Sequence, residues 1–515
     1  MDLIKPFEEK YADYLKDESG FTGFAEGISF PSNEAELRTV LGALSEQKIP
    51  FTVQGSKTGI AGACVPSCGY ILNLSQMNKI TGINMRGNTF FLEVQPGISL
   101  CDINQALYSK AYLTQGWTEE SLAAYTQLRK AKRQFFPPNP TESTATIGGM
   151  FSVNAAGPNA LYYGKTSDYV EALSFALTNN ELWHIQRGEY VFNELGCPLP
   201  NNRFLRLPHQ PGHPSSPFAT RADLDLIDFL AASEGMLGVI ESLTLRLLPE
   251  PEKNWGVVCL FKSDQAAIDF SNALHKQQFE KVFLTTIEYF DQCTLELIMD
   301  LRATSSQLAG IPDIPPDIKA CVYIELITDE AGDSPIESAL LSLLELLADC
   351  GGDPDLTWAG ASQEEIEKFG RFRHAAPEAV NMINSKRRLT KPCLQKTAAD
   401  FSAPCEHFKN LCQMYHEDIQ RSNIQGAVFG HVGRCHLHVN FLPVNIEEMQ
   451  TAQSIIQDWA KKIIALGGWI SEENGIGKLK KNLLNDVITE GAKQNIRSVK
   501  QFFDPHELLN PGNLL

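Results

Sequence analysis

Several features that are common in proteins of this length are missing from the 515-residue sequence. No apolar run approaches the roughly 18 residues that mark a membrane-spanning helix, and the start lacks the basic and then apolar order of a secretion signal. Positive charge is scarce too: the formal net charge is −18, which suits neither nucleic acid nor an anionic membrane as a partner. We therefore expect a cytoplasmic protein that binds no nucleic acid and has no membrane span.

Closely spaced cysteine pairs are also missing. The 12 cysteines are scattered and none forms a Cys-x-x-Cys pair, so we expect no iron–sulfur cluster on this chain itself. Many lie inside apolar runs, as Cys259 does, which favours buried thiols in a reducing compartment over disulfides. Electrons that leave a bound redox cofactor would then pass to another protein or to a small acceptor.

Three glycine-rich stretches indicate a large ligand. Residues 53–62 follow an apolar run but form neither a Walker loop nor the Gly-x-Gly-x-x-Gly fingerprint of a nicotinamide-binding unit. Residues 138–168 gather small, hydroxyl and glycine residues, and residues 233–240 place two glycines before a β-rich run. Glycine lets a backbone approach closely, and exposed N–H groups suit a pyrophosphate, so the expected ligand is a flavin dinucleotide. A glycine-rich turn without a ligand is the alternative.

The length exceeds what one hydrophobic core supports, so we expect at least two domains. Residues 1–250 begin with an Asn33-capped helix that leads into a strand, as an α+β unit would. Prolines among charges at 249–253 favour a linker. Residues 257–359 then alternate as β-α-β-β-α-β, which predicts a ferredoxin-like antiparallel sheet. A helix over 446–465 follows, with Asn445 as its cap.

A histidine-rich segment offers metal ligands. If residues 435–441 form a strand, His436, His438 and Asn440 share one face, and His431 in the preceding Gly-His-x-Gly turn can fold back toward them. Imidazoles with a carboxylate suit Zn²⁺, Mn²⁺ or Fe²⁺. On chemistry alone, hydrogen-bonded core histidines are the favoured interpretation of the same residues.

Together with residues 430–440, 473–477 and 510–512, the three glycine-rich stretches resemble the FAD-linked oxidase family, whose flavin domain is of the vanillyl-alcohol oxidase type. The C-terminal half is similar to the branch of D-lactate dehydrogenases, glycolate oxidase flavin subunits and D-2-hydroxyglutarate dehydrogenases. The resemblance runs from about residue 10 to the C-terminus and implies an α+β fold. That fold is a two-subdomain FAD-binding domain over 1–250, a ferredoxin-like substrate or cap domain over 251–443, and a C-terminal helical segment, 444–515, that returns to the flavin.

The resemblance also implies which residues contact FAD. They lie in the three glycine-rich stretches and near the C-terminus, where an ordinary turn is the alternative for the last of them. They are Gln54, Gly55, Ser56, Lys57, Thr58, Gly59, Pro138, Thr141, Gly148, Gly149, Ser152, Asn154, Gly157, Gly164, Glu234, Gly235, Gly238, Val239, Ile240 and Asn510. Residues 54–62 contain no His or Cys, so we expect non-covalent FAD, although Cys64 and Cys68 leave a covalent link open.

His431, His438 and Glu473 fall on the family's metal-ligand positions, which implies a divalent ion, Zn²⁺, Mn²⁺ or Fe²⁺. Asn474, however, stands where the family has its catalytic histidine, and an amide cannot serve as a base. His436 is present where the family has no histidine, so we expect that His436, or a water activated by the metal, replaces the base. A metal site retuned for another substrate, or lost, is the rival interpretation.

Arg373 aligns with the arginine-bearing helix of the family, with Arg371 as an alternative, and Lys396 is a weaker candidate for binding the substrate carboxylate. A surface salt bridge would explain each of them as well. The predicted enzyme is an FAD-dependent dehydrogenase that oxidises a small D-2-hydroxy acid, of lactate, glycolate or 2-hydroxyglutarate type, to the 2-oxo acid by hydride transfer to flavin N5.

The expected electron acceptor is a redox partner protein or a quinone, and the partner would be an electron-transfer flavoprotein, an iron–sulfur subunit or a cytochrome. Through such a partner the protein could lie at the periphery of the inner membrane. A homodimer is compatible with the sequence. The alternatives are a flavin-carrying electron-transfer subunit with no substrate of its own and a flavin oxidase of another alcohol. An ether-forming relative of alkylglycerone-phosphate synthase is disfavoured, because that branch is histidine-rich where this chain has residues 471–474.

Overall fold

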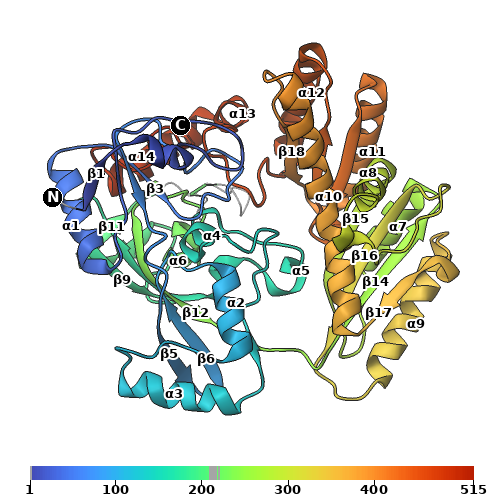
Figure 1. The fold of residues 1–515 in the computed structure, drawn as a ribbon, viewed down its shortest axis with the longest axis horizontal. Coiled ribbons are helices and arrows are strands. Elements are labelled where there is room, and N and C mark those ends of the chain that lie inside the picture. Colours follow the sequence, from blue (N-terminus) through green and yellow to red (C-terminus); the bar gives the residue numbers. More distant parts are fainter. Residues whose placement is uncertain (1–2, 208–216, 219–220, 515) are drawn as a thin grey trace. The chain divides into compact units, whose positions relative to one another are not determined.

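The computed structural model describes residues 3–207, 217–218 and 221–514, which divide into two compact units (Figure 1). Unit 1 comprises residues 1–156, 165–250 and 473–515, and unit 2 comprises residues 157–164 and 251–472. The chain therefore passes from unit 1 to unit 2 and back twice. Among the described residues, none of the helices combines the length and the hydrophobicity that crossing a bilayer requires.

Unit 1 contains two main sheets. The first has the order β1-β2-β4-β3, in which β2, β4 and β3 run parallel, and the second is antiparallel with the order β5-β6-β12-β8-β9. These strands are β1 Ile4–Pro6, β2 Gly27–Ser29, β3 Phe51–Gln54, β4 Tyr70–Asn73, β5 Ile80–Arg86, β6 Thr89–Val94, β8 Val170–Ala176, β9 Leu182–Gln186 and β12 Val239–Arg246. Two short pairs complete the unit, β7 Gln134–Phe135 with β13 Leu248–Pro249, and β10 Cys197–Leu199 with β11 Arg203–Leu205.

Helix α1, Glu34–Glu46, shows how sequence sets structure in unit 1. The side chain of Asn33 caps it by accepting from the Glu36 N–H, and Glu36 returns to accept from Ser32, as predicted. Its buried face, Leu37, Val40, Leu41 and Leu44, packs with residues of both main sheets in one core. The other helices of the unit are α2 Leu100–Ser109, α3 Glu119–Lys130, α4 Ile147–Val153, α6 Leu226–Leu230, α13 Lys481–Val487 and α14 Glu490–Phe503.

Unit 2 is built on one antiparallel sheet of seven strands, ordered β17-β14-β16-β15-β19-β20-β18. The first four are the predicted ferredoxin-like strands, in the spatial order that this fold requires, and β19, β20 and β18 extend the sheet beyond them. The strands are β14 Lys253–Phe261, β15 Phe283–Asp291, β16 Ala320–Thr328, β17 Trp358–Gly360, β18 Thr397–Ser402, β19 Gly426–Gly430 and β20 His436–Phe441. The helices are α5 Ala160–Tyr163, α7 Asp264–Leu274, α8 Gln292–Arg302, α9 Ser334–Asp349, α10 Gln363–Thr390, α11 Cys405–Ser422 and α12 Ile446–Ala465.

One expectation about cysteines fails in unit 2. Cys405 and Cys435 form a disulfide, whereas the other ten cysteines are free thiols. The two residues are 30 positions apart, so sequence spacing gave no sign of the pair. They meet because β18 and β20 are antiparallel neighbours, and Cys405 follows the end of β18 while Cys435 precedes β20.

Candidate functional site

In unit 1 the structure brings two of the three predicted glycine-rich stretches together at Asn510. The Asn510 side chain accepts from the backbone N–H of Val53 at 2.7 Å and donates to the carbonyl oxygen of Glu234 at 2.7 Å. Asn510 itself adopts a left-handed backbone conformation with φ of 43°, and Gly235 opposite it has φ of 70°. One buried amide therefore joins the end of β3 to the 233–240 stretch, although these segments lie far apart in sequence.

The 53–62 and 138–168 stretches also meet. A Cβ on Gly55 would lie 2.1 Å from the hydroxyl oxygen of Thr146, which caps α4, and a Cβ on Gly148 would lie 3.0 Å from the carbonyl oxygen of Pro96. Both glycines thus allow close packing of backbone that any side chain would push apart. The loop after β3 and the start of α4 therefore pack directly against each other at Gly55 and Thr146.

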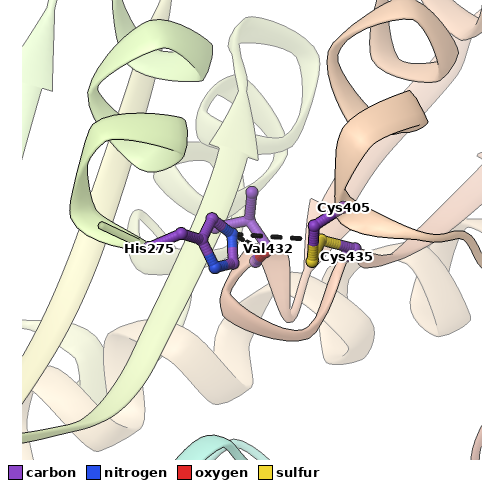
Figure 2. The surroundings of a disulfide bond; sticks show 4 residues. All are labelled: His275, Cys405, Val432 and Cys435. Carbon is purple, nitrogen blue, oxygen red and sulfur yellow. Dashed lines mark hydrogen bonds between the residues drawn. A yellow bond between two sulfur atoms is a disulfide. The ribbon is translucent and has the colours of Figure 1, made fainter. Parts of the chain in front are cut away.

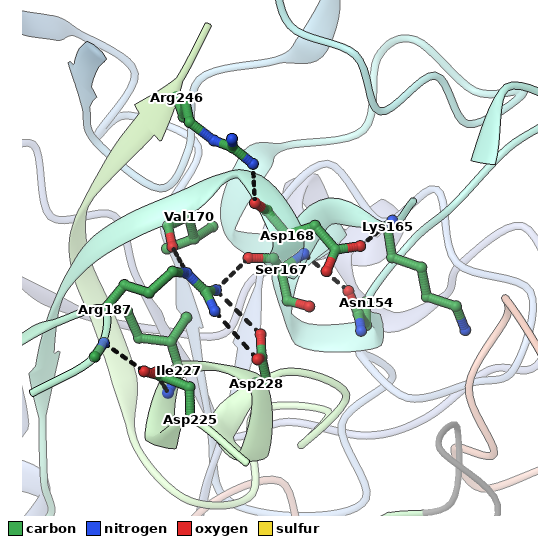
Figure 3. A network of polar contacts seen from close by, with 11 residues as sticks. Asn154, Lys165, Ser167, Asp168, Val170, Arg187, Asp225, Ile227, Asp228 and Arg246 are labelled. Atoms are coloured by element: carbon green, nitrogen blue, oxygen red, sulfur yellow. Dashed lines mark hydrogen bonds and ion pairs between the residues drawn. The ribbon is translucent and has the colours of Figure 1, made fainter. Parts of the chain in front are cut away.

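An ionic network fixes the end of the 138–168 stretch (Figure 3). The guanidinium of Arg187 donates to both carboxylate oxygens of Asp228, at 3.1 and 3.0 Å, and to the carbonyl oxygens of Ser167 and Val170. Asn154 accepts from the Ser167 N–H at 3.0 Å, so its side chain serves the same turn. A bidentate pair at this place holds the chain rigidly where it enters β8.

The remaining predicted flavin contacts divide into scaffold and surface positions. The Gln54 amide is buried and donates to the carbonyl oxygens of Tyr14 and Cys64, so it braces the loop from within. Ser56, Thr58 and Gly59 lie in the loop beyond β3, and Lys57 adopts φ of 63° there and donates to the Asp13 carbonyl oxygen. Ser152 in α4 donates to the Gly148 carbonyl oxygen, and Gly149 lies in the same helix.

Other predicted contacts lie at segment boundaries. Pro138 and Thr141 precede α4, and Gly157 and Gly164, both at positive φ, delimit the 157–164 segment that belongs to unit 2. A Cβ on Gly238 would meet the Phe175 ring at 2.3 Å, and Val239 and Ile240 begin β12 beside β8.

A buried carboxylate in unit 1 anchors the segment that follows residue 472. Glu234 accepts from the backbone N–H groups of Ile476 and Gly477, at 2.6 and 2.7 Å, and burial raises the pKa of this carboxyl. Lys478 lies next in the chain and donates to Asn513 at 2.7 Å, and burial lowers its pKa to about 8. The turn that carries Asn474 is thus fixed to the 233–240 stretch by charge-assisted hydrogen bonds.

In unit 2 the structure brings the three histidines of the predicted segment together. Each offers a ring nitrogen, and these nitrogens lie within 4.8 Å of one another. His436 and His438 project from the same face of β20, as the alternation predicted, and His431 follows β19 directly. The imidazole of His431 is 5.3 Å from that of His436 and 5.4 Å from that of His438, centroid to centroid.

Two buried carboxylates hold these rings. Glu288 of β15 is hydrogen-bonded to Nδ1 of His431, while Asp400 of β18 lies 2.6 Å from Nε2 of His436 and 3.5 Å from Nδ1 of His438. Neither carboxylate was predicted from sequence, because each belongs to a strand that is adjacent to the histidines only in the folded sheet. Carboxylates behind imidazoles orient the rings and make them stronger ligands, as is usual around protein-bound metals.

His436 carries the strongest sign that the cluster accommodates a further group. Its side chain is fully buried, and its Nδ1 has no hydrogen-bond partner among the described residues. An unpaired buried nitrogen costs free energy unless something binds it. Because Asp400 faces Nε2, the tautomer with the proton on Nε2 leaves a lone pair on Nδ1, which suits either a metal ion or a proton. The donor set therefore fits a divalent transition metal.

The three residues predicted to bind the substrate carboxylate differ in burial and in their partners. Arg373 of α10 is buried, and its Nε lies 3.3 Å from Glu288, the same carboxylate that holds His431. Arg371, two residues earlier, is exposed and lies 3.9 Å from Glu367. Lys396 is also exposed and donates to Asn381, at the end of β18 remote from His436. Arg373 thus shares a direct partner, Glu288, with His431 of the histidine cluster.

The chain next to the cluster is itself held by an ion pair. Arg434, between His431 and His436, lies 2.7 Å from Glu472, which also accepts from the Ser402 hydroxyl. Glu473 and Asn474 follow directly and are half-buried at the start of the last segment of unit 1.

Comparisons with known proteins identify the family of the chain. The family described as "FAD linked oxidases, C-terminal domain" matches residues 250–514, just over half of the chain, and the "FAD binding domain" family matches residues 25–118. The glycolate oxidase subunit GlcD of Bacillus subtilis (strain 168) is 25% identical over 500 residues, which cover 96% of this chain and 90% of that protein. A D-lactate dehydrogenase of Anaerostipes hadrus is 24% identical, covering 98% of this chain and 93% of that protein.

The fold is found in solved structures as well. An alkyldihydroxyacetonephosphate synthase superposes with a TM-score of 0.64 at 13% identity, covering 99% of this chain and 82% of that one. This likeness confirms the predicted α+β fold, with a flavin domain of the vanillyl-alcohol oxidase type and an antiparallel-sheet cap. The chain belongs to the FAD-linked oxidase family and is an FAD-binding oxidoreductase.

Proposed function

We propose that this protein is a metal-assisted FAD-dependent dehydrogenase of a small D-2-hydroxy acid, of lactate, glycolate or 2-hydroxyglutarate type. The observation that carries the proposal is the cluster of three imidazoles backed by Glu288 and Asp400, in which the buried Nδ1 of His436 lacks a partner. The names of the relatives, a glycolate oxidase subunit and a D-lactate dehydrogenase, support this class of substrate. The product is the 2-oxo acid.

His431 and His438 are the proposed metal ligands, with Glu473 as the carboxylate ligand, because all three fall on the metal-ligand positions of the family. When bound, the ion supplies Lewis acidity toward the substrate hydroxyl and carboxylate, and FAD supplies the hydride acceptor. FAD would be held by the glycine-rich stretches of unit 1 without a covalent bond. Burial raises the pKa of the Cys64 thiol to about 12, so this cysteine is a poor nucleophile for such a link.

The proposed base is His436. Asp400 orients the ring through Nε2 and stabilises the cation that forms when Nδ1 takes the hydroxyl proton of the substrate. Asn474 then has no proton to move, and its amide would serve only to orient the substrate. Arg373, positioned by Glu288, would bind the substrate carboxylate.

Electrons would leave the flavin for a protein partner, an electron-transfer flavoprotein, iron–sulfur subunit or cytochrome, or for a quinone. The glycolate oxidase relative is named as a subunit, which supports a protein partner. We further propose a cytoplasmic protein, with attachment to the inner membrane only through such a partner.

Anaerobic titration with candidate acids tests the proposal. D-lactate, L-lactate, glycolate and D-2-hydroxyglutarate are added to the oxidised protein, and loss of the visible flavin absorbance is followed before and after chelation and after return of Zn²⁺, Mn²⁺ or Fe²⁺. We expect bleaching by one acid, abolished by the chelator and restored by one metal. Bleaching that survives exhaustive chelation would contradict the role of the metal.

The His436→Ala variant separates the base from the ligands. We expect flavin reduction to slow by about 100-fold or more, the usual contribution of a general base, while flavin content stays unchanged. His407→Ala, on α11 of the same unit, is the matched control and should reduce normally. Equal rates in the two variants would contradict the assignment of His436.

The absence of the family's histidine at Asn474 favours a second candidate, an electron-transfer subunit with no substrate of its own. If no 2-hydroxy acid bleaches the flavin in the presence of any of the three metals, but a reduced partner protein does, this second function replaces the first.

A further inference from the structure

The disulfide between Cys405 and Cys435 (Figure 2) involves a residue, Cys435, that directly precedes His436 of the histidine cluster in the chain. Cys405 is the first residue of α11 and is exposed, whereas Cys435 is buried and directly precedes His436. The bond spans the end of the β18–β20 ladder, where Ser402 pairs with His436 and the Ala403 N–H donates to the Cys435 carbonyl oxygen. One sulfur is thus accessible to a reagent in solution while the other faces the protein interior.

A histidine outside the cluster stands beside the buried sulfur. Nε2 of His275 lies 3.1 Å from the carbonyl oxygen of Val432 and 3.9 Å from Sγ of Cys435 (Figure 2). A carbonyl oxygen only accepts, so Nε2 carries the proton and presents it beside the sulfur. None of the roles proposed above for the histidine cluster uses His275.

We propose that Cys405, Cys435 and His275 form a thiol–disulfide exchange site that accepts a dithiol reductant. A thiolate of the reductant attacks the exposed Sγ of Cys405, the S–S bond breaks, and Sγ of Cys435 leaves with the electron pair. The Nε2–H of His275 donates a hydrogen bond that stabilises the departing thiolate, and this thiolate takes its proton from solvent. The second thiol of the reductant then resolves the mixed disulfide, which releases Cys405 and leaves the reductant as a disulfide, so two electrons and two protons pass to the protein.

The placement of the two sulfurs gives the direction of attack. Exchange requires access to the sulfur that is attacked, and Cys405 alone offers it. Negative charge that develops on Cys405 in the second step lies at the N-terminus of an 18-residue helix, which stabilises it. The buried sulfur has no such helix end but has the His275 N–H.

Opening the bond would act on the turn that carries the histidines. Cys435 is held at φ of 53°, a left-handed conformation that L-residues rarely adopt, and the N–H groups of Arg434 and His436 both donate to the His431 carbonyl oxygen. The disulfide helps to hold this conformation, so its reduction should loosen the turn. This consequence rests on the proposed function; the exchange itself does not.

Mass spectrometry of the full-length holoprotein tests the exchange. The air-oxidised protein is treated with reduced glutathione, quenched with acid, alkylated with N-ethylmaleimide and digested. We expect glutathione on Cys405 and maleimide on Cys435, without denaturant. Cys101 and Cys393, which are free and exposed, are internal controls that take maleimide from the outset. Glutathione on Cys435, a bond that opens only in denaturant, or no disulfide in the oxidised protein would overturn the proposal.

The His275→Leu variant tests the hydrogen-bond donor. Leucine has no N–H to stabilise the departing thiolate of Cys435, so the exchange should slow by about tenfold or more while the circular dichroism spectrum stays the same, whereas His275→Gln, which keeps an N–H donor, should restore part of the rate. An unchanged rate would overturn the role of His275. These measurements need no 2-hydroxy acid, so their failure is distinguishable from failure of the proposed function.

The effect of the disulfide on the histidine cluster is measured separately, as the affinity for Zn²⁺. Cys405→Ser, which cannot form the bond, should bind Zn²⁺ more weakly than the oxidised wild type, by severalfold, and should match the reduced wild type. Cys101→Ser is the matched control. Equal Zn²⁺ affinity of oxidised protein, reduced protein and Cys405→Ser would show that the disulfide does not govern the cluster.

Discussion

At the scale of single residues, Glu288 links two predicted functional groups. Its carboxylate accepts from Nδ1 of His431 through one oxygen and from Nε of Arg373, 3.3 Å away, through the other. Glu288→Gln keeps the size but removes the charge and one acceptor. We expect divalent-metal affinity to fall by about 10–100-fold, the usual effect of losing a carboxylate behind a ligand histidine, measured by calorimetric titration of the chelated protein.

Glu241→Gln supplies the control for that experiment. Glu241 is equally buried and makes a bidentate ion pair with Arg38, but it belongs to unit 1. The Glu241→Gln variant should have a lower free energy of unfolding but the same metal affinity as the wild type. If both variants bind metal as the wild type does, Glu288 does not support a ligand.

Lys478 provides a prediction about pH. Burial lowers its pKa from an ordinary value near 10.5 to about 8. Below pH 8 the lysine is charged in both states. Between pH 8 and 10.5 the folded protein loses this proton while the unfolded chain keeps it, so the unfolded state binds more protons and the contribution of Lys478 to stability rises with pH. We measure the unfolding free energy of wild type minus that of Lys478→Met by urea titration. This difference should become more positive from pH 8 to 10.5.

Taking a difference removes the titration of cysteines and tyrosines, which both proteins share. Lys461→Met, an exposed lysine on α12, should give a difference from wild type that does not change with pH. A flat profile for Lys478→Met as well would mean that Lys478 keeps its ordinary proton affinity.

The sequence could predict these residue-level features only where the partners are local. Alternation placed His436 and His438 on one face because a strand fixes the direction of every second side chain. The partner of His431, Glu288, is 143 residues away, and that of His436, Asp400, is 36 away. Such pairs follow from the order of strands in the sheet, which no local pattern specifies.

At the scale of elements, helices with a cap and a clear apolar face were predicted well. Helix α12 begins and ends at Ile446 and Ala465 as expected, with Asn445 accepting from the Glu448 N–H. The resemblance implied a helix around Arg373, but the bounds of the 28-residue α10 were not predicted, because its face is weakly apolar and Pro377 lies inside it. Strand β19 was missed as well, since it is buried throughout and shows no alternation.

The turn at residues 475–477 gives a prediction at this scale. Gly477 has φ of 54°, and a Cβ there would lie 2.1 Å from the carbonyl oxygen of Ala61, which is backbone and cannot move aside cheaply. Gly477→Ala should lose about 2 kcal/mol or more in urea unfolding, from left-handed strain and the collision together. It should also weaken FAD binding, measured by quenching of flavin fluorescence, because Ala61 belongs to the 53–62 stretch.

Gly370→Ala is the matched control, since it lies within α10 and a Cβ there meets nothing within 4 Å. It should stabilise the protein by about 0.5–1 kcal/mol, because alanine loses less backbone entropy in a helix. If Gly477→Ala is as harmless as Gly370→Ala, the turn is not held against residue 61 in solution.

At the scale of the whole molecule, the two units differ in how the chain builds them. Unit 1 is assembled from three separate segments, whereas all seven strands of the unit 2 sheet lie between residues 253 and 441. The histidines and the carboxylates Glu288 and Asp400 all belong to this sheet or the turn within it. The metal-binding part of the proposed function therefore needs no strand from the flavin-binding unit.

A fragment of residues 251–473 should consequently fold and bind metal without FAD. We expect a cooperative urea transition and uptake of one Zn²⁺, measured by calorimetry, with no flavin bound, because unit 2 contains its own core and the fragment retains Glu473. It lacks α5, which lies on β15, so some stability will be lost. The same fragment with His438→Ala should fold alike and bind Zn²⁺ at least about tenfold more weakly. A folded fragment that takes up no metal would contradict this prediction. The three imidazoles of unit 2 would then be hydrogen-bonded core side chains that bind no metal without unit 1.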